Sequence, residues 1–368
     1  MKKELVKRDS LIFILAMAFF LVGCAKNNQK NVPEDKEIGS AKNISNQENV
    51  ANANSKFGFL VDARDPQDVF VAVQKTGAAW LRPHVGSFIW GEIEKSPGNL
   101  NFSQTDALVK KAQQYNFNLL ITIWPYASWQ YQDAGSRSRC DVGEESGFSE
   151  DLPRYRCNPT DWNFYQKWLS SAVERYDGDG QDDMPGLAKP IKYWEIGNEP
   201  DLKDPGLTFY KGTPQDYAEL LQKSFESVKK ADSEAKVVIA GAAGTSPDFA
   251  KFWNEFFGIK DIGNYFDIGN IHAISGGNRK DLNVSDYQRW LSERNIKKPV
   301  WVTEAEGKIK SKNVQDNAKE LNDLVDSALK AGAEKIFFTH ASLTGAQDRY
   351  NPQVIVKEAQ YYKNIIQQ

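Results

Sequence analysis

The chain has 368 residues, with 46 Lys and Arg against 49 Asp and Glu and a formal net charge of −3 at pH 7. Beyond its amino-terminal segment it contains no block of Lys or Arg, which argues against a nucleic-acid-binding surface. Residues 57–368 suffice for one large α/β barrel but are too few for two enzyme domains joined by a linker.

The amino-terminal segment is typical of an exported protein. Basic residues precede an apolar run over residues 11–22, and the run ends in the sequence LVGC, residues 21–24. The run is shorter than the ~20 apolar residues that cross a bilayer and has the proportions of a signal-peptide core. LVGC resembles a bacterial lipobox, which implies that residues 1–23 are removed and that Cys24 is acylated. The alternative is an ordinary signal peptide with an incidental cysteine.

Acylation of Cys24 would anchor the protein to a membrane of the bacterial cell envelope without spanning it. One acyl chain binds a bilayer only marginally, whereas several chains hold a protein firmly. Residues 24–56 are polar, rich in Asn, Lys and Gln, and have no hydrophobic period. Such a segment buries too little apolar surface to fold, so we expect a disordered linker between the anchor and the folded domain.

From Phe57 onward, short apolar runs alternate with amphipathic helical stretches. The predicted strands are 57–61, 78–82, 118–124, 191–197, 236–240, 266–272, 299–304 and 335–340. Helix signals lie between them, such as Thr213-Pro214, an N-cap residue followed by proline in the first turn. Alternation of this kind favours a parallel sheet with right-handed crossovers, and eight strands are what a (β/α)8 TIM barrel needs.

A doubly wound open sheet is the alternative fold. Such a sheet usually carries a glycine-rich turn after its first strand, and Val61-Asp62-Ala63-Arg64 is not such a turn. We therefore expect the barrel, as a single domain over residues 57–368.

The long connection between the third and fourth predicted strands contains Cys140 and Cys157. In an exported protein an isolated pair favours a disulfide over a metal site, because no other Cys or His lies nearby in sequence. Two free thiols are the alternative. Loops that directly follow strands lie on the catalytic face of a barrel, so this loop is expected to form a wall of the cleft.

The same connection contains a glycine-punctuated acidic turn with the residues Asp177, Asp179, Asp182 and Asp183. Its oxygen-rich composition is that of a calcium loop, but the closing glutamate of an EF-hand is missing. A solvated turn on the face opposite the cleft is expected, with a structural calcium ion as the weaker alternative.

Two glutamates each close an apolar run. Glu199 lies in YWEIGNEP, residues 193–200, and Glu304 ends PVWVTE, residues 299–304. Carboxylates at the ends of different parallel strands can face each other across a cleft, the minimum arrangement for splitting a glycosidic bond. The alternative is two surface glutamates at loop starts. Glu195, inside its strand, and Glu306, beyond the strand end, are the nearest competitors for these roles.

Asn198-Glu199-Pro200 after the fourth strand and Thr303-Glu304 at the seventh resemble the retaining glycoside hydrolases of clan A, families 5 and 39 in particular. The resemblance covers the folded region in strand order. It implies that Glu199 is the general acid/base and Glu304 the nucleophile, and that Asn198 contacts the sugar 2-hydroxyl. Arg82, at the end of the second strand, matches an arginine that keeps the nucleophile ionised. A surface or core-edge arginine is the alternative.

These roles need the two carboxyls in different protonation states. Glu304 must be ionised to attack the anomeric carbon, while Glu199 must hold a proton for the leaving oxygen. In retaining sites the carboxyls lie ~5–5.5 Å apart, so the charge of Glu304 helps to raise the pKa of Glu199.

The histidines fall at predicted strand ends: His84 after the second strand, His272 at the sixth and His340 at the eighth. We expect them to bond sugar rather than metal, because no His-Glu-x-x-His motif accompanies them. After the third strand, Trp124, Tyr126 and Trp129 are candidates for stacking on sugar rings.

Two positions depart from the family. Ile274 stands where these enzymes commonly have a tyrosine bonded to the nucleophile, and Phe338-Thr339-His340 stands where a tryptophan often floors the catalytic subsite. The leading interpretation is a retaining β-glycosidase, monomeric and without a required cofactor, acting on polysaccharides or oligosaccharides. The alternative, motivated by these departures, is a surface lipoprotein that binds carbohydrate without hydrolysing it.

Overall fold

The computed structural model describes residues 55–144, 146–147, 151–204, 206–274, 279–307, 310–339, 343 and 351–368. The predicted signal peptide, Cys24, nearly all of the linker, and His340 lie outside the described residues. Residues 46–368 belong to one compact unit, and the description below concerns that unit alone.

Eight parallel strands form the barrel, in the order β7-β4-β3-β2-β1-β10-β9-β8. Their bounds are β1 Phe57–Phe59, β2 Trp80–Leu81, β3 Asn118–Ile123, β4 Tyr193–Ile196, β7 Lys236–Ile239, β8 Gly269–Ala273, β9 Val300–Ala305 and β10 Ala333–Phe338. Parallel bridges Val238–Ile268 and Ala242–Ile271 join the outer members β7 and β8. The predicted TIM barrel and all eight predicted strands are confirmed.

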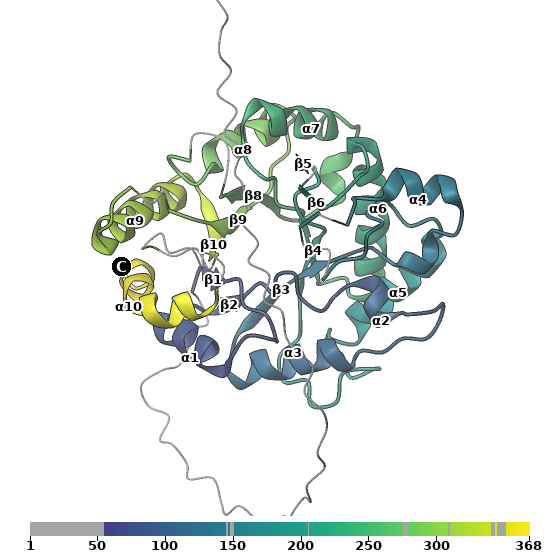
Figure 1. Ribbon diagram of the computed structural model, residues 1–368, viewed down its shortest axis with the longest axis horizontal. Helices are drawn as coiled ribbons and strands as arrows, with labels where there is room; N and C mark the ends of the chain where they lie inside the picture. Colours follow the sequence, from purple (N-terminus) through teal and green to yellow (C-terminus); the bar gives the residue numbers. More distant parts are fainter. Residues whose placement is uncertain are drawn as a thin grey trace, which may run out of the picture. The chain divides into compact units, whose positions relative to one another are not determined.

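Helices surround the strands (Figure 1). Their bounds are α1 Gln67–Thr76, α2 Trp90–Ile93, α3 Ser103–Gln114, α4 Ala134–Cys140, α5 Trp162–Glu174, α6 Pro214–Ala231, α7 Pro247–Phe257, α8 Val284–Ser292, α9 Val314–Lys330 and α10 Gln353–Ile366. Short 3-10 turns lie at η1 Ser128–Gln130 and η2 Ile262–Asn264, and β5 Lys203–Asp204 pairs with β6 Leu207–Thr208 as an antiparallel hairpin. The predicted start of α6 is confirmed, since Thr213 and Asp216 form a capping box.

An aromatic plug fills one end of the barrel. Trp301 of β9 lies 5.0 Å from Tyr193 of β4 and 5.7 Å from Trp80 of β2, measured between ring centroids. Strands this far apart in the sheet order meet only across the barrel interior. Gly58 of β1 makes room for the plug, because a Cβ there would lie 2.5 Å from the ring of Phe337. The plug closes the amino-terminal end of the strands, so the polar residues further along each strand gather at the other end.

The connections that follow the strands pack against one another above this polar end. Cys140 and Cys157 form the predicted disulfide. Their loop lies against the β5–β6 hairpin, since Arg156 Nη1 donates to Thr208 O at 2.7 Å. The hairpin itself begins four residues after Glu199. The cysteine loop therefore supports the segment that follows the first glutamate.

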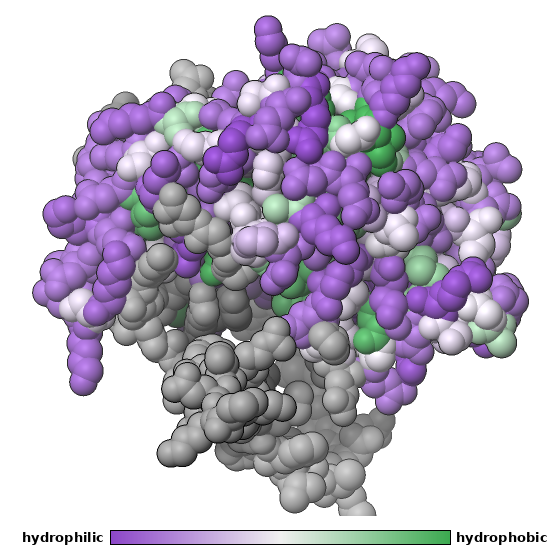
Figure 2. All heavy atoms as spheres, turned by 90° about the horizontal axis from the view of Figure 1, so that it is seen from above, coloured by the Kyte–Doolittle hydropathy of each residue, from purple (hydrophilic) through white to green (hydrophobic). Residues whose placement is uncertain are grey.

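The outer surface is polar. The face in Figure 2 is mostly hydrophilic, with small isolated apolar spots. Among the large hydrophobic residues that the structure describes, only Phe164 and Val356 count as exposed. Within the same residues no helix combines the length and apolarity that crossing a membrane requires.

Candidate active site

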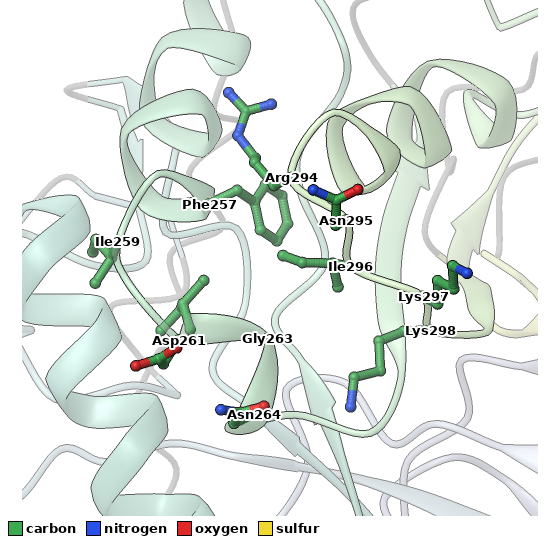
Figure 3. A pocket seen from close by; sticks show the side chains of 11 residues that line it. Phe257, Ile259, Asp261, Gly263, Asn264, Arg294, Asn295, Ile296, Lys297 and Lys298 are labelled. Carbon is green, nitrogen blue, oxygen red and sulfur yellow. The ribbon is translucent and has the colours of Figure 1, made fainter.

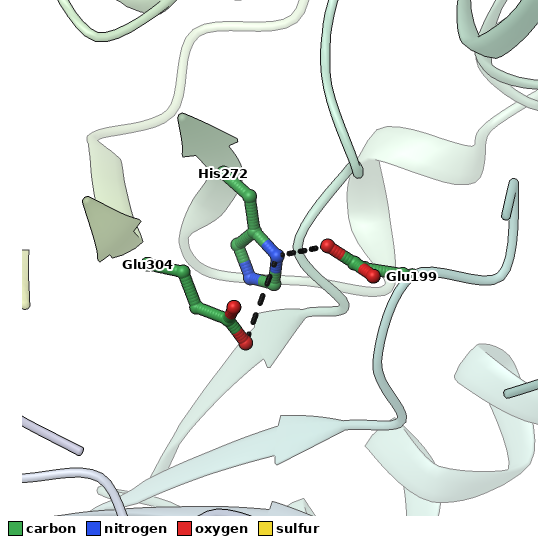
Figure 4. A group of neighbouring side chains, drawn as sticks. All are labelled: Glu199, His272 and Glu304. Atoms are coloured by element: carbon green, nitrogen blue, oxygen red, sulfur yellow. Dashed lines mark hydrogen bonds and ion pairs between the residues drawn. The ribbon is translucent and has the colours of Figure 1, made fainter. Parts of the chain in front are cut away.

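Glu199 and Glu304 lie at the polar end of the barrel, where β4 and β9 finish. Gly197 and Glu199 both have positive φ, 76° and 38°, so the chain turns sharply after β4 and returns the Glu199 side chain over the barrel mouth. Carboxylate oxygens of Glu199 and Glu304 and a ring nitrogen of His272 all lie within 4.8 Å of one another. Figure 4 shows His272 between the two carboxylates.

Arg82, just after β2, connects Glu304 to Glu195 and Asn198. The guanidinium donates through Nε to Glu195 Oε2 at 2.8 Å, through Nη1 to Glu304 Oε1 at 2.8 Å, and through Nη2 to Asn198 Oδ1 at 2.7 Å. Its side chain is fully buried, so it is no core-edge arginine. Because the amide oxygen of Asn198 accepts from Arg82, the amide nitrogen of Asn198 is available to donate elsewhere.

His272 of β8 lies beneath Glu199. Its Nδ1 is 2.7 Å from Glu199 Oε1 and 3.8 Å from Glu304 Oε1, and its Nε2 is 3.0 Å from Thr303 Oγ1. Burial lowers the pKa of His272 to about 4, so the imidazole is neutral at pH 7.

The two carboxyls differ in how their charge is supported. Burial raises the pKa of Glu199 to about 8, against the opposing charge of Arg82. Burial also raises the pKa of Glu304, but Glu304 accepts a charged hydrogen bond from Arg82, which Glu199 does not. Because Arg82 already neutralises Glu195 and Glu304 in part, a third ionised carboxylate here would be uncompensated. The Arg82 contact thus favours the ionised form at Glu304, while burial favours the protonated form at Glu199.

A polar layer beneath the glutamates holds them in place. Glu195 accepts hydrogen bonds from Arg82, from Thr122 and from Asn270 Nδ2, the last at 2.6 Å. Glu195 is thus a buried carboxylate paired with Arg82 inside the barrel rather than a rival to Glu199. The other competitor, Glu306, accepts from Thr339 Oγ1 at 2.9 Å.

The sequence did not predict that Thr122, Asn270 and Thr303 contribute to this polar layer. All three are strand residues that face inward. Alternation of apolar and polar residues identifies the inward face of a strand only when the outward face is polar. Since the helices cover the outer face of these strands, that face is apolar too, and the alternation of polar and apolar residues is lost. Polar residues inside otherwise apolar strands, as in Leu-Leu-Ile-Thr-Ile, were the one available hint.

The aromatic residues after β3 differ from the expectation. Trp124 and Tyr126 are 0% and 1% exposed, and their polar atoms donate to the carbonyl oxygens of Val85 and Phe209. Trp129 donates to Glu94 O and contacts Trp90 and Phe164 on the α5 side. In this arrangement Trp124 and Tyr126 offer no open ring face for a sugar.

His84 lies next to this cluster. It is partly exposed, and its ring centroid is 5.8 Å from that of Trp124 and 6.1 Å from that of Phe209. Ile274, which replaces the expected tyrosine, is partly exposed just after β8. Among the described residues, Arg82 donates to Glu304, and His272 contacts Glu199 and lies 3.8 Å from Glu304.

Glu199, His272 and Glu304 also form a donor set that suits a metal ion. Two contacts disfavour a metal ion. The positive charge of Arg82 lies next to Glu304 Oε1, and His272 Nδ1 already contacts Glu199. At the acidic turn, Glu174, Asp177 and Asp179 offer oxygens within 4.8 Å of one another. Asp177, Asp179 and Asp183, however, accept from backbone N–H groups within the turn. A calcium ion there stays a prediction.

A separate pocket of about 370 Å³ lies between α7, η2 and the segment that enters β9 (Figure 3). Arg294, Lys297 and Lys298 contribute cations to it, with Asp261 opposite. The segments that form it precede β8 and β9, so it lies at the other end of the strands from Glu199 and Glu304.

No protein-family model and no curated protein matches the chain. Solved structures do match. A glucosidase from Croceicoccus marinus has a TM-score of 0.60 at 15% identity, covering 87% of this chain and 69% of that one. This chain has the same fold as that glucosidase. A family 39 glycoside hydrolase from the gut symbiont Bacteroides cellulosilyticus WH2 has a TM-score of 0.55 at 16% identity, covering 87% and 65%.

A psychrophilic family 10 endo-β-1,4-xylanase has a TM-score of 0.58 at 16% identity, covering 84% of this chain and 97% of that chain. Structural matches at identities this low establish the barrel fold alone. They leave the chemistry to be argued from the residues at the mouth of the barrel.

Proposed function

We propose that the protein is a retaining β-glycosidase that hydrolyses O-glycosidic bonds of polysaccharides or oligosaccharides. The observation that carries this proposal is the closeness of Glu199 and Glu304, whose nearest oxygens lie within 4.8 Å. Retaining enzymes keep their carboxyls ~5–5.5 Å apart, whereas inverting enzymes need ~6.5–9.5 Å to admit a water. The spacing supports a double displacement.

In the first step Glu304 attacks the anomeric carbon as a carboxylate while Glu199 protonates the glycosidic oxygen. A pKa of about 8 keeps Glu199 protonated at neutral pH, and Arg82 supports the charge of Glu304. In the second step Glu199, now a carboxylate, takes a proton from the water that attacks the glycosyl-enzyme. Because Asn198 Oδ1 accepts from Arg82, its amide nitrogen can donate, which supports a contact with the sugar 2-hydroxyl.

The first test uses Glu199→Gln and Glu304→Gln with aryl β-glucosides and aryl β-xylosides, because similar structures include a glucosidase and xylanases. Each substitution is expected to lower kcat/KM by several orders of magnitude. Glu219→Gln, at an exposed position of α6, is the matched control and should hydrolyse at the wild-type rate. Proton NMR of the first-formed product is expected to show the β-anomer, the result of retention.

Wild-type activity in either active-site variant would overturn the assignment. Binding of glycans without hydrolysis during long incubation would instead favour the non-catalytic lipoprotein. We further propose that acylated Cys24 tethers the enzyme to a membrane of the bacterial cell envelope and that it acts there as a monomer. The support for this anchor is the lipobox-like sequence LVGC and the polar linker that follows it.

A further inference from the structure

The contacts behind Glu199 determine which nitrogen of His272 carries the proton. A neutral imidazole has one N–H, so one ring nitrogen donates and the other accepts. Nδ1 lies 2.7 Å from Glu199 Oε1, and Nε2 lies 3.0 Å from Thr303 Oγ1. The hydrogen-bond partners of Thr303 therefore determine whether His272 Nδ1 donates to Glu199 or accepts from it.

Asn270 provides the first step, because its amide orientation is defined by its neighbours. Its Nδ2 lies 2.6 Å from Glu195 Oε1 and 3.1 Å from Ile239 O, and both of these oxygens only accept. The amide nitrogen must therefore lie on that side. Asn270 Oδ1 then faces Thr303 Oγ1 at 2.9 Å.

Thr303 has a single hydroxyl hydrogen and two neighbours that can only accept it. These are Asn270 Oδ1 at 2.9 Å and Glu195 Oε1 at 3.2 Å. If the hydroxyl pointed at His272 instead, the amide oxygen of Asn270 would lose its contact, and a buried unpaired acceptor costs about 1–3 kcal/mol. Thr303 therefore donates away from His272 and accepts from its Nε2–H.

It follows that His272 Nδ1 carries a lone pair directed at Glu199 Oε1. A carboxylate oxygen 2.7 Å from that lone pair would be repelled, whereas a protonated carboxyl would donate to it. We propose that Thr303 fixes His272 in the Nε2–H tautomer, so that the Nδ1 lone pair holds the acid proton on Glu199. This inference rests on the proposed function and assigns His272 and Thr303 to it as positioning residues.

The segment just after β7 fixes the position of the His272 ring. A Cβ at Gly241, just after β7, would lie 2.0 Å from His272 Nε2, so only glycine lets the imidazole pack this closely. Gly241 O also accepts from the backbone N–H of Glu199 at 3.2 Å. One glycine thus positions both partners. The charged or titratable groups that act on this pair from the neighbouring elements are Arg82, Glu195, Asp201, Glu304 and Glu306.

The fixed tautomer serves both chemical steps. When a glycosidic oxygen binds, it competes with Nδ1 for the Glu199 proton, and the C–O bond breaks as the Glu304–carbon bond forms. Glu199 is then a carboxylate facing the Nδ1 lone pair, which disfavours the charged form. Glu199 is thereby made a stronger base. It takes the proton of the attacking water as the water oxygen bonds the anomeric carbon and the Glu304–carbon bond breaks, so Glu199 is protonated and Glu304 ionised again.

Thr303→Val tests the inference by removing the acceptor for Nε2–H while keeping the shape of the side chain. His272 is then released to adopt the Nδ1–H tautomer, which donates to the Glu199 carboxylate and lowers the pKa of Glu199. An acid with a lower pKa loses its proton at lower pH. The alkaline limb of the kcat/KM profile is therefore expected to move down by about one pH unit, whereas Thr303→Ser should keep the wild-type profile.

A second measurement does not depend on turnover. The chain has three histidines, so 15N-histidine labelling of the full-length protein gives few imidazole signals, and a His272→Gln spectrum assigns those of His272. We expect Nε2 protonated and Nδ1 bare in the wild type. A wild-type Nδ1–H signal would overturn the inference, as would an alkaline limb unmoved in a folded, active Thr303→Val variant. Absence of hydrolysis with the Nε2–H tautomer present would instead count against the glycosidase assignment alone.

Discussion

Arg82 supplies the positive charge on which the arrangement of the site depends. It is fully buried and binds two carboxylates, Glu195 and Glu304, from strands on either side of it. Two buried carboxylates sharing one guanidinium leave a local excess of negative charge. Burial raises the pKa of the neighbouring Glu199, the charge of Arg82 opposes that rise, and the charges of Glu195 and Glu306 add to it, so that Glu199 stays protonated at neutral pH.

Arg82→Met is therefore expected to affect folding as well as activity. It leaves Glu195 and Glu304 buried without a cation, which should lower the free energy of unfolding by about 3–5 kcal/mol at pH 7. Burial raises the pKa of Glu304, and protonation of that carboxyl removes its unpaired charge, so the deficit should shrink in urea denaturation as the pH is lowered. Activity should fall as well, because Glu304 loses the group that favours its ionised form.

Arg289→Met is the matched control for this variant. Arg289 is 60% exposed and pairs with Asp286 on the surface of α8. Exposed pairs contribute about 0.2–1 kcal/mol. An equal loss of stability in both variants, or a deficit for Arg82→Met that does not change with pH, would contradict the role given to Arg82.

At the scale of elements, strand positions follow from local sequence, whereas side-chain partners do not. Each strand is an apolar run bounded by turn residues, which short-range patterns report. The partners of Arg82 depend on closure of the barrel, since 113 residues separate it from Glu195 and 222 from Glu304. The sequence could therefore place both glutamates at strand ends without predicting the network through Glu195, Asn270 and Thr303.

The same limit explains the aromatic residues after β3. Trp124 and Tyr126 are at a strand end, where ring faces can line a cleft. Phe209, from the segment after the β5–β6 hairpin, packs against Trp124 with ring centroids 5.7 Å apart, and its carbonyl accepts from Tyr126. A covering segment that follows a different strand cannot be anticipated from the local pattern around Trp124.

The disulfide of the cysteine loop is expected to contribute to stability. The disulfide closes a separation of 17 residues between Cys140 and Cys157. In the chain-entropy model a loop of this size contributes about 3 kcal/mol. The variant Cys140→Ser/Cys157→Ser should unfold several degrees below the wild type in calorimetry.

Reduction of the wild type should produce the same decrease in melting temperature, and the reductant should leave the double variant unchanged. Because the loop supports the hairpin after Glu199 through the Arg156–Thr208 contact, we also expect a higher KM with a smaller change in kcat. A melting temperature equal to that of the wild type would show that the bridge adds nothing to stability.

At the scale of the whole molecule, the proposed anchor and the barrel belong to separate parts of the chain. Residues 46–368 belong to one compact unit, and Cys24 lies outside it in the sequence. Anchoring should therefore determine where hydrolysis occurs without changing its rate on a small substrate. The proposed tether would confine the enzyme to substrate within reach of the predicted linker, residues 24–56, because the end-to-end distance of a flexible chain of n residues scales as ≈ 5–6 Å × √n.

Cys24→Ser tests this separation in a bacterial host. Without acyl chains the protein should leave the detergent phase in phase partitioning and stop incorporating labelled fatty acid, because several chains are needed for firm binding. Its kcat/KM on an aryl β-glycoside should equal that of the wild type, since Cys24 is not part of the barrel. Retention of Cys24→Ser in the detergent phase would rule out this cysteine as the anchor, and a changed kcat/KM would show that the amino-terminal segment acts on the barrel.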